Sequence, residues 1–147
     1  CSRNLDLAET EDNTFWKVAR DQELITKIQA LQRSIAFQGE LVGEGVQKNR
    51  YNLKGQKFFL FDIYDIDEQR YLNPMERQFI TGLLGIEHVP IVHTYYVAKP
   101  EVSVSDLLVK AEDTSALFNT EREGIVFKCD RASFKAISNK FLLSGGD

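Results

Sequence analysis

A carboxylate and three lysines near the end of the chain are the residues whose types and spacing most readily do chemistry. Glu123 and Lys128 bound the sequence Glu-Gly-Ile-Val-Phe-Lys, and Lys135 and Lys140 follow in an apolar segment. A carboxylate in this position can hold Mg²⁺ directly or through water. Ideal strand alternation sends Glu123 and Lys128 to opposite faces, so only one would face a given pocket unless the strand bulges. Lys135 and Lys140 also differ in parity.

A second carboxylate, Glu40, lies in the sequence Gly-Glu-Leu-Val-Gly at the end of a strand predicted over residues 35–42. A strand-end carboxylate can accept hydrogen bonds from the hydroxyls of a sugar, and glycines let a ligand approach the backbone closely. Alternatively, Glu40 lies on a solvent-facing strand surface beside Gln38. Taken alone, the pattern favours this second interpretation.

Residues 48–57 hold four basic side chains, one tyrosine and no acidic residue. Because the net charge of the chain is −4, this loop is the clearest candidate for a surface that contacts phosphate. Its aromatic side chain can also stack on a base or a sugar. A solvated hairpin loop explains the composition equally well. The four basic residues are Lys48, Arg50, Lys54 and Lys57.

The segment 57–64 is apolar on both faces, which predicts a strand inside a layered domain. Alternation places Phe59, Phe61 and Ile63 on one face and Asp62 on the other. Most of these aromatic residues are expected in the core, whereas one at the lip of a pocket can stack on a planar base. Asp62 needs a partner if it is buried, because an unpaired carboxylate in an apolar strand is costly.

Periodicity and turn residues predict an α+β fold of mostly antiparallel sheets flanked by helices. A helical pattern covers residues 14–31, and Asp21 is expected to cap its second half. The sequence Asn-Pro-Met-Glu begins a helix over residues 73–85, and Ser105 is expected to cap a short helix that ends at residue 111. Further strands are expected over residues 89–97, 124–129 and 134–143.

Length and composition indicate one soluble globular domain, with 147 residues of which 43% are hydrophobic and 27% charged. The net charge of −4 argues against nucleic-acid binding by bulk charge alone, so such binding needs a local basic patch. No apolar run approaches the roughly 20 residues that span a bilayer. The first residues carry no secretory signal and no methionine, which fits a processed or truncated chain.

Neither the cysteines nor the histidines are spaced for a metal site. Cys1 and Cys129 lack zinc-type spacing, and we expect a reduced, cytoplasmic setting. His88 and His93 are five residues apart in a β-type segment, so alternation places them on opposite faces. We interpret both histidines as structural residues and Trp16 as a core residue.

The order of these motifs resembles the motif series of the covalent nucleotidyltransferases. This superfamily contains ATP-dependent RNA and DNA ligases and mRNA-capping enzymes. The chain resembles the bacterial RNA ligases of the Deinococcus type and, more distantly, the phage RNA ligases. The resemblance covers nearly all of residues 1–147, which it presents as a partial nucleotidyltransferase domain, and residues 123–128 are its most specific part. The motifs are Cys-Ser-Arg-Asn, Gly-Glu-Leu-Val-Gly, Phe-Phe-Leu-Phe-Asp-Ile-Tyr, Glu-Gly-Ile-Val-Phe-Lys and Phe-Lys-Ala-Ile-Ser-Asn-Lys-Phe-Leu.

The resemblance implies ATP and Mg²⁺ (or Mn²⁺) as cofactors and RNA ends, including those of a nicked duplex, as partners. By position, Arg3 would contact the nucleotide or the RNA phosphate, and Glu40 would bind the ribose hydroxyls. Phe61 would stack on adenine, with Phe59 as the second choice, and Glu123 would assist the catalytic metal. The candidates for neutralising the α-phosphate are Lys128, Lys135 and Lys140. The family often has two lysines two residues apart in its last motif, but position 133 is serine here.

The family's nucleophilic lysine lies in a Lys-x-Asp-Gly motif, and no lysine of this chain is followed by x-Asp-Gly. The resemblance implies that the motif lies upstream, in a missing N-terminal part of the same protein. The chain would then not adenylylate itself. Two alternatives stay open: a DNA ligase or GTP-using capping enzyme, and a non-catalytic module that binds nucleic acid or nucleotide.

Overall fold

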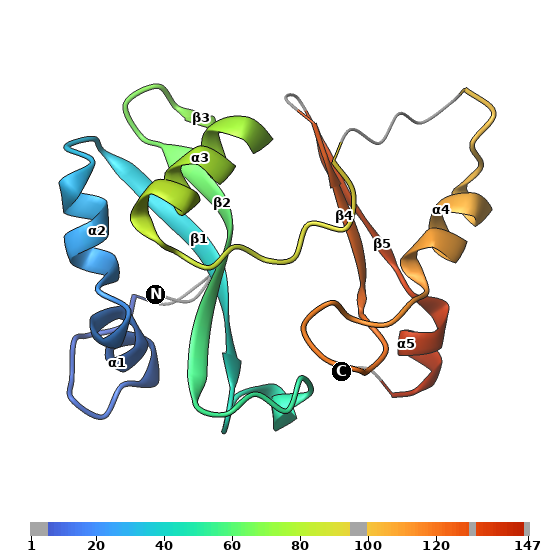
Figure 1. Cartoon of the computed structure of the whole chain (residues 1–147), viewed down its shortest axis with the longest axis horizontal. Helices are drawn as coiled ribbons and strands as arrows, with labels where there is room; N and C mark the ends of the chain where they lie inside the picture. Colours follow the sequence, from blue (N-terminus) through green and yellow to red (C-terminus); the bar gives the residue numbers. More distant parts are fainter. Residues whose placement is uncertain (1–5, 95–99, 130–131, 146–147) are drawn as a thin grey trace. The chain divides into compact units, whose positions relative to one another are not determined.

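The computed structural model describes residues 6–94, 100–129 and 132–145, and the chain divides into two compact units (Figure 1). The first unit comprises Cys1–Asn49 and Leu53–Val89, and the second comprises Arg50–Asn52 and Pro90–Asp147. Both units combine helices with antiparallel strands, which confirms the α+β class predicted from the sequence. Within the described residues, no helix has the length and apolar character needed to cross a bilayer.

The first unit is built on a three-stranded antiparallel sheet in the order β1-β2-β3. α3 follows the sheet and packs on it through Ile80, which joins the core cluster that includes Leu60 and Ile63 of β2. A short 3₁₀ helix, η1, lies in the connection between β1 and β2. The elements are α1 (Thr14–Asp21), α2 (Leu24–Ala30), β1 (Ile35–Gly43), η1 (Gln47–Asn49), β2 (Gln56–Asp65), β3 (Arg70–Tyr71) and α3 (Pro74–Leu84).

The helical pattern expected over residues 14–31 forms two helices, α1 and α2. Glu23, between α1 and α2, adopts a left-handed conformation with φ 54°, which no continuous α-helix permits. The prediction that Asp21 caps the second helix is wrong, because Glu23 holds that position and makes no side-chain cap. Asn13 caps α1 through its side-chain oxygen. Trp16 is partly buried, and its indole N–H donates to the carbonyl of Leu7 at 2.8 Å.

β2 contains one more residue than β1 at Phe61, where the register between the strands shifts. Phe59 pairs with Glu40, whereas Ile63 pairs with Phe37. Since residues 37 and 40 have opposite parity on β1, Phe59 and Ile63 lie on opposite faces of the sheet. The expectation that Phe59, Phe61 and Ile63 share one face is therefore wrong.

Both ends of α3 match the sequence prediction. Asn73 accepts from the backbone N–H of Glu76, and the Glu76 side chain accepts from the backbone N–H of Asn73, which completes a capping box. Gly85 ends the helix in a left-handed conformation with φ 59°.

The strand expected over residues 89–97 is not observed in its described part. His88 forms a single parallel bridge with Leu60, and the N–H of Val89 donates to the Leu60 carbonyl at 2.9 Å. Residues 90–94 form no strand, because Pro90 has no N–H with which to continue the ladder. Residues 95–97 lie outside the described residues.

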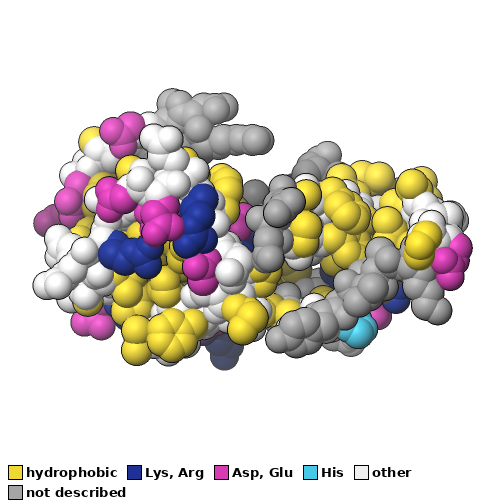
Figure 2. All heavy atoms as spheres, turned by 90° about the horizontal axis from the view of Figure 1, so that it is seen from above, with side chains coloured by type: hydrophobic (Ala, Val, Ile, Leu, Met, Phe, Trp, Pro, Cys, Tyr) yellow, Lys and Arg dark blue, Asp and Glu magenta, His cyan; other side chains and the backbone are white. Residues whose placement is uncertain are grey.

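The second unit pairs a β-hairpin with two short helices, and its visible face in Figure 2 is mostly hydrophobic. Ser103, not Ser105, caps the first of these helices and forms a capping box with Asp106. The strand predicted over residues 134–143 ends at residue 137, because the nearly fully buried Ser138 accepts from the N–H of Phe141 and begins a helix. Lys140 therefore lies on a helix and not on a strand. The elements are α4 (Val104–Ala111), β4 (Gly124–Lys128), β5 (Ser133–Ile137) and α5 (Asn139–Leu143).

Gly124 lets β4 approach β5 at the first residue of the hairpin ladder. A Cβ at this position would lie 2.1 Å from the carbonyl oxygen of Ala136 and 3.0 Å from the Cα of Ile137. Both atoms belong to the backbone of β5, so a side chain cannot be accommodated by rotation of a neighbour. The close pairing of β4 with β5 therefore requires glycine.

We predict that Gly124→Ala destabilises the protein by about 1–3 kcal/mol, because the added methyl group forces the two strands apart. Gly82→Ala is the matched control: Gly82 lies within α3, and nothing lies within 4 Å of a Cβ added there. We expect this control to stabilise the protein by about 0.5–1 kcal/mol. Calorimetric unfolding measures both changes, and a Gly124→Ala variant as stable as the parent would contradict the steric argument.

Glu76 joins the start of α3 to β3 through charged hydrogen bonds. Arg70 donates to its carboxylate from Nη1 at 2.8 Å and from Nη2 at 2.9 Å, and the N–H of Asn73 donates at 2.8 Å. These hydrogen bonds, that from Arg70 first, lower the pKa of Glu76 from 4.5 to about 2. Because the folded state favours the ionised carboxylate, its stabilisation is present above pH 4.5 and is lost as the pH falls towards about 2.

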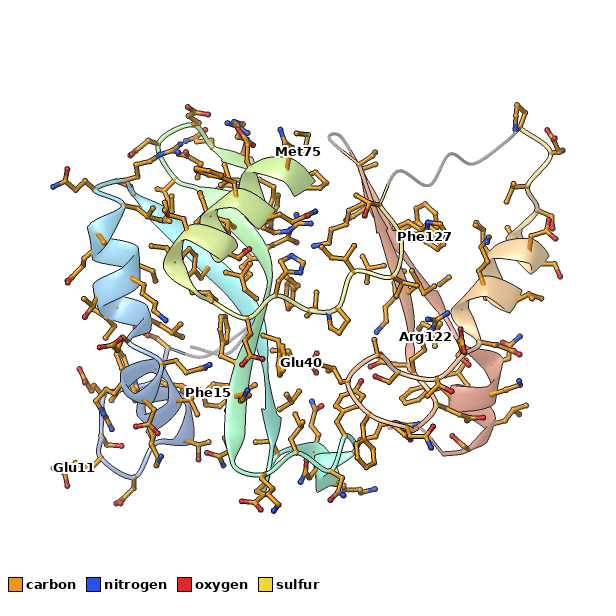
Figure 3. The ribbon with its side chains drawn as sticks, viewed as in Figure 1. Glu11, Phe15, Glu40, Met75, Arg122 and Phe127 are labelled. Atoms are coloured by element: carbon orange, nitrogen blue, oxygen red, sulfur yellow. The ribbon has the colours of Figure 1, made fainter. Side chains whose placement is uncertain are left out.

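We predict that the chain is more stable than its Glu76→Gln variant by a constant amount above about pH 5, and that the difference shrinks between about pH 4.5 and 2. The ion pair is partly exposed, so solvent screening keeps the effect modest. Urea unfolding across this pH range measures the difference. The control is Glu11→Gln, at an exposed residue on the outside of the first unit (Figure 3), which should leave the pH profile unchanged. Parallel profiles for the parent and Glu76→Gln would contradict the prediction.

Candidate functional site

The β4–β5 hairpin separates a basic face from an apolar face. Lys135 pairs with Val126 and Lys128 pairs with Ser133, so both lysines lie on one face of the hairpin. On the other face, Phe127 (labelled in Figure 3) stacks on Phe134 with their ring centroids 4.9 Å apart. The hairpin therefore presents two positive charges together.

Glu123 immediately precedes β4, and its carboxylate accepts a hydrogen bond from the ammonium group of Lys135. Its backbone carbonyl accepts from the N–H of Ser138 at 2.9 Å, which extends the hairpin ladder by one residue. Strand parity alone would send Glu123 to the face opposite Lys128. The contact nevertheless joins this carboxylate to Lys135, which shares a hairpin face with Lys128.

Lys140, the remaining candidate lysine, lies apart from this pair. Its Nζ is 3.7 Å from the carboxylate of Glu112, beside a hollow of about 230 Å³. The hollow is also lined by Asp113, Glu121 and Ser138. Of the four residues proposed for catalysis, the structure thus joins Glu123 to Lys135, places Lys128 on the same face and leaves Lys140 on α5.

Glu40 and Phe59, two of the nucleotide-binding candidates, lie directly opposite each other in the β1–β2 pair. Glu40 is exposed and extends from β1 (Figure 3), whereas Phe59 is only 5% exposed. Phe61, at the register shift, is partly exposed, and a ring must be accessible to stack on a base. These burial values favour Phe61 over Phe59 for stacking. Arg3 lies outside the described residues.

The space beside the glycines around Glu40 is filled by other atoms of the same hairpin. A Cβ on Gly39 would lie 2.2 Å from the ring of Phe58, and one on Gly43 would lie 2.0 Å from the carbonyl oxygen of Gly55. Both spaces are filled by β2 or by the turn before it. The two glycines therefore serve close packing of the hairpin, and the expectation that they admit a ligand is not needed to explain them.

Arg77 is a buried charged residue that the sequence analysis did not single out. Its Nη1 lies 3.3 Å from Oδ1 of Asp62, and its Nε donates to Nε2 of His88 at 2.9 Å. Burial lowers the pKa of Arg77, and the Asp62 charge acts in the opposite direction. Asp62 thus has the partner that its position in an apolar strand requires. The signal in the sequence is the helical spacing from Arg77 to the buried Ile80 of α3.

The four basic residues of segment 48–57 do not form one uniform positive surface. The guanidinium of Arg50 lies over the ring of Phe141 at 4.2 Å, within the second unit. Lys57 lies on β2 and is ion-paired with Glu87 at 2.5 Å. Lys48 lies in η1 with φ 59°. Lys54 and Lys57 line a hollow of about 480 Å³ in the first unit, together with Lys17, Asp21 and Glu44. Acidic side chains from other segments therefore offset part of the positive charge.

Among the described residues, no group of three His, Cys, Asp or Glu side chains could hold a metal ion. The donor chemistry of the basic face fits a different arrangement, in which Glu123 contributes one carboxylate. Mg²⁺ is commonly held by one or two carboxylates, with water and substrate phosphates completing its shell. Glu123 can therefore supply one carboxylate ligand to a divalent metal, with water or phosphate oxygens as the other ligands.

A family model described as RNA ligase matches residues 1–141 of the chain. No curated protein matches the chain significantly. Solved structures of the Naegleria gruberi RNA ligase do match. The ligase with PPi is 42% identical, with a TM-score of 0.91, and the match covers 98% of this chain and 44% of that one. A mutant of that ligase with ATP and Mn is 41% identical, with a TM-score of 0.93, and the match covers 100% of this chain and 45% of that one.

Another mutant of the same ligase, with AMP and Mn, is 42% identical with a TM-score of 0.92. That match covers 98% of this chain and 44% of the ligase. The chain therefore spans less than half of the length of the ligases it matches. Since the family model covers nearly the whole sequence and the identity exceeds 40% over almost all of the fold, the chain belongs to the RNA ligase family.

Proposed function

We propose that the chain forms part of the adenylation domain of an ATP-dependent RNA ligase. The observation that carries the proposal is the ion pair between Glu123 and Lys135, together with Lys128 on the same face of the β4–β5 hairpin as Lys135. A carboxylate next to two ammonium groups suits a phosphate–metal complex better than either charge alone. The Naegleria gruberi structures with ATP and Mn support the same ligand class.

The proposed reaction has three displacements at phosphorus. The neutral amine of a lysine bonds to the α-phosphorus of ATP, the bond to the bridging oxygen breaks, pyrophosphate leaves, and an amine proton passes to solvent. An oxygen of an RNA 5′-phosphate then bonds to that phosphorus, and the P–N bond breaks as the lysine nitrogen takes up a proton from solvent. Finally, an RNA 3′-hydroxyl bonds to the 5′-phosphorus, AMP leaves, and the hydroxyl proton passes to solvent. Each step requires neutralisation of charge on the phosphate oxygens.

In the second unit, Lys128 and Lys135 neutralise charge on the α-phosphate, and Glu123 supplies one ligand to the metal. Bound Mg²⁺ or Mn²⁺ supplies Lewis-acid polarisation of phosphate oxygens. Both lysines are part of a paired hairpin, and its backbone ladder fixes the face from which their side chains extend. Lys140 has a separate partner in Glu112 and no assigned role in this scheme.

In the first unit, Glu40 accepts hydrogen bonds from the ribose hydroxyls, Phe61 stacks on adenine, and Arg3 contacts a phosphate. The exposed carboxylate of Glu40 and the partly exposed ring of Phe61 support these roles. The basic residues of segment 48–57 contact the RNA backbone, with Lys54 and Lys57 in the hollow of the first unit as the main contributors.

The nucleophile comes from a Lys-x-Asp-Gly segment upstream of Cys1 in the parent protein, because no lysine of the chain is followed by x-Asp-Gly. Residues 1–147 then form one partial nucleotidyltransferase domain. The partners are RNA 3′-hydroxyl and 5′-phosphate ends, including those of a nicked duplex, and the proposed setting is the cytoplasm.

We predict that the 147-residue chain gains no AMP when incubated with ATP and Mg²⁺ or Mn²⁺, because it lacks the nucleophile. A longer protein that includes the upstream Lys-x-Asp-Gly segment should gain one AMP, as measured by intact mass spectrometry. An AMP adduct on the short chain would refute the assignment of the nucleophile. A longer protein that gains AMP but joins no RNA ends would refute the ligase function. GTP in place of ATP, and DNA in place of RNA 3′-hydroxyl ends, test the alternative activities.

We predict that the three candidate lysines differ in the longer protein. Lys128→Met and Lys135→Met should each slow AMP transfer by about 100-fold or more, since each removes a charge aligned with the phosphate. Lys140→Met, the matched control, makes the same chemical change on α5 and should leave the rate within about threefold. Single-turnover transfer of labelled AMP gives the rates, and thermal melts confirm folding. A loss in Lys140→Met equal to that in Lys135→Met would overturn this assignment.

A further inference from the structure

Glu123 and Lys135 form an ion pair with each other, whereas the proposed function has Glu123 bind the metal and Lys135 bind phosphate. The ammonium of Lys135 donates to the Glu123 carboxylate, although the carboxylate is needed for the metal and the ammonium for phosphate. An ammonium and a divalent cation compete for the same carboxylate lone pairs. The pair and the working site are therefore alternative states of the same two side chains.

The pair is accessible and is easily opened. Each of the two side chains is 43% exposed, so water and small ions reach both of them. An ion pair at such exposure shifts an equilibrium by roughly fivefold at most, because solvent screens the attraction. A divalent cation carries twice the charge of an ammonium group, so it can displace Lys135 without unfolding the hairpin.

The hairpin determines where Lys135 goes after it is displaced. Pairing with Val126 keeps Lys135 on the face that carries Lys128. A metal at Glu123 repels the ammonium, and the nearest favourable partner is an anion on this basic face. Binding of the metal and binding of phosphate would then support each other.

We propose that Glu123 and Lys135 form a latch that the metal opens: Glu123 exchanges the Lys135 ammonium for a divalent cation, and the released ammonium becomes available to phosphate. This inference rests on the proposed function, because it names the residue that competes with the metal at the same site. Lys135 thereby acts on metal affinity as well as on the phosphate.

The test uses Mn²⁺ alone and NMR spectra of the full 147-residue chain. Substoichiometric Mn²⁺ should broaden the amide signals of residues 123–124 and of the facing residues 136–138. Lys135→Gln should increase this broadening about two- to fivefold, because it removes the competing cation. Glu123→Gln should abolish it. Signals near Glu112 and Glu121 serve as an internal reference for non-specific binding to carboxylates.

Two control variants separate competition from general electrostatics. Lys135→Arg keeps the positive charge, so Mn²⁺ should broaden its amide signals as much as those of the parent chain. Lys110→Gln removes the same charge from α4 of the same unit and should also resemble the parent. Diamagnetic Mg²⁺ supplies a second readout: the Lys135 Cε signal should move towards its position in Glu123→Gln as the latch opens.

Equal broadening in Lys135→Gln and the parent chain would overturn the latch, as would broadening that persists in Glu123→Gln or is absent from both chains. A Lys135 signal that ignores Mg²⁺ would also overturn it. None of these results depends on RNA joining. Joining by the longer protein is assayed separately, so failure of the latch is distinguishable from failure of the ligase function.

Discussion

The charged hairpin of the second unit depends on the absence of a side chain at Gly124. Backbone atoms of β5 occupy the space where a Cβ would lie, so β4 and β5 reach their register only with glycine at this position. That register places Lys135 on the face of Lys128 and within reach of Glu123. One steric constraint thus sets which hairpin face carries the two lysines and how near Lys135 lies to Glu123, because the backbone ladder fixes the face from which each side chain extends.

In the first unit, the buried charge of Arg77 is the constraint on the arrangement of side chains. Arg77 reaches Asp62 and His88, and this satisfies a carboxylate in a strand that otherwise carries large apolar residues. Removal of one partner would leave a buried charge without compensation, which costs more than the pair contributes. The extra residue at Phe61 has a separate effect, since it sets which aromatic side chains share a face with Glu40.

Each unit has lysines that are ion-paired with carboxylates or lie near them. Lys57 is balanced by Glu87, and Lys54 lines a hollow that also contains Asp21 and Glu44. In the hairpin, the Glu123 carboxylate is ion-paired with Lys135, and Lys128 lies on the same face as Lys135. Proximity of opposite charges in water stabilises little, so these exposed pairs are better suited to exchange partners than to hold the fold together.

The sequence by itself determined the fold class, the two ends of α3 and the motif order that places the chain among the RNA ligases. These features depend on local capping, on period and on motif identity, all of which are read within a few residues. Tertiary structure alone decided that Arg77 pairs with Asp62, that Lys135 meets Glu123, and that Ser138 ends a strand and begins α5. Ideal alternation failed at Phe61 because a single extra residue in one strand reverses the facing of every residue beyond it. That residue becomes visible only when the second strand is in place.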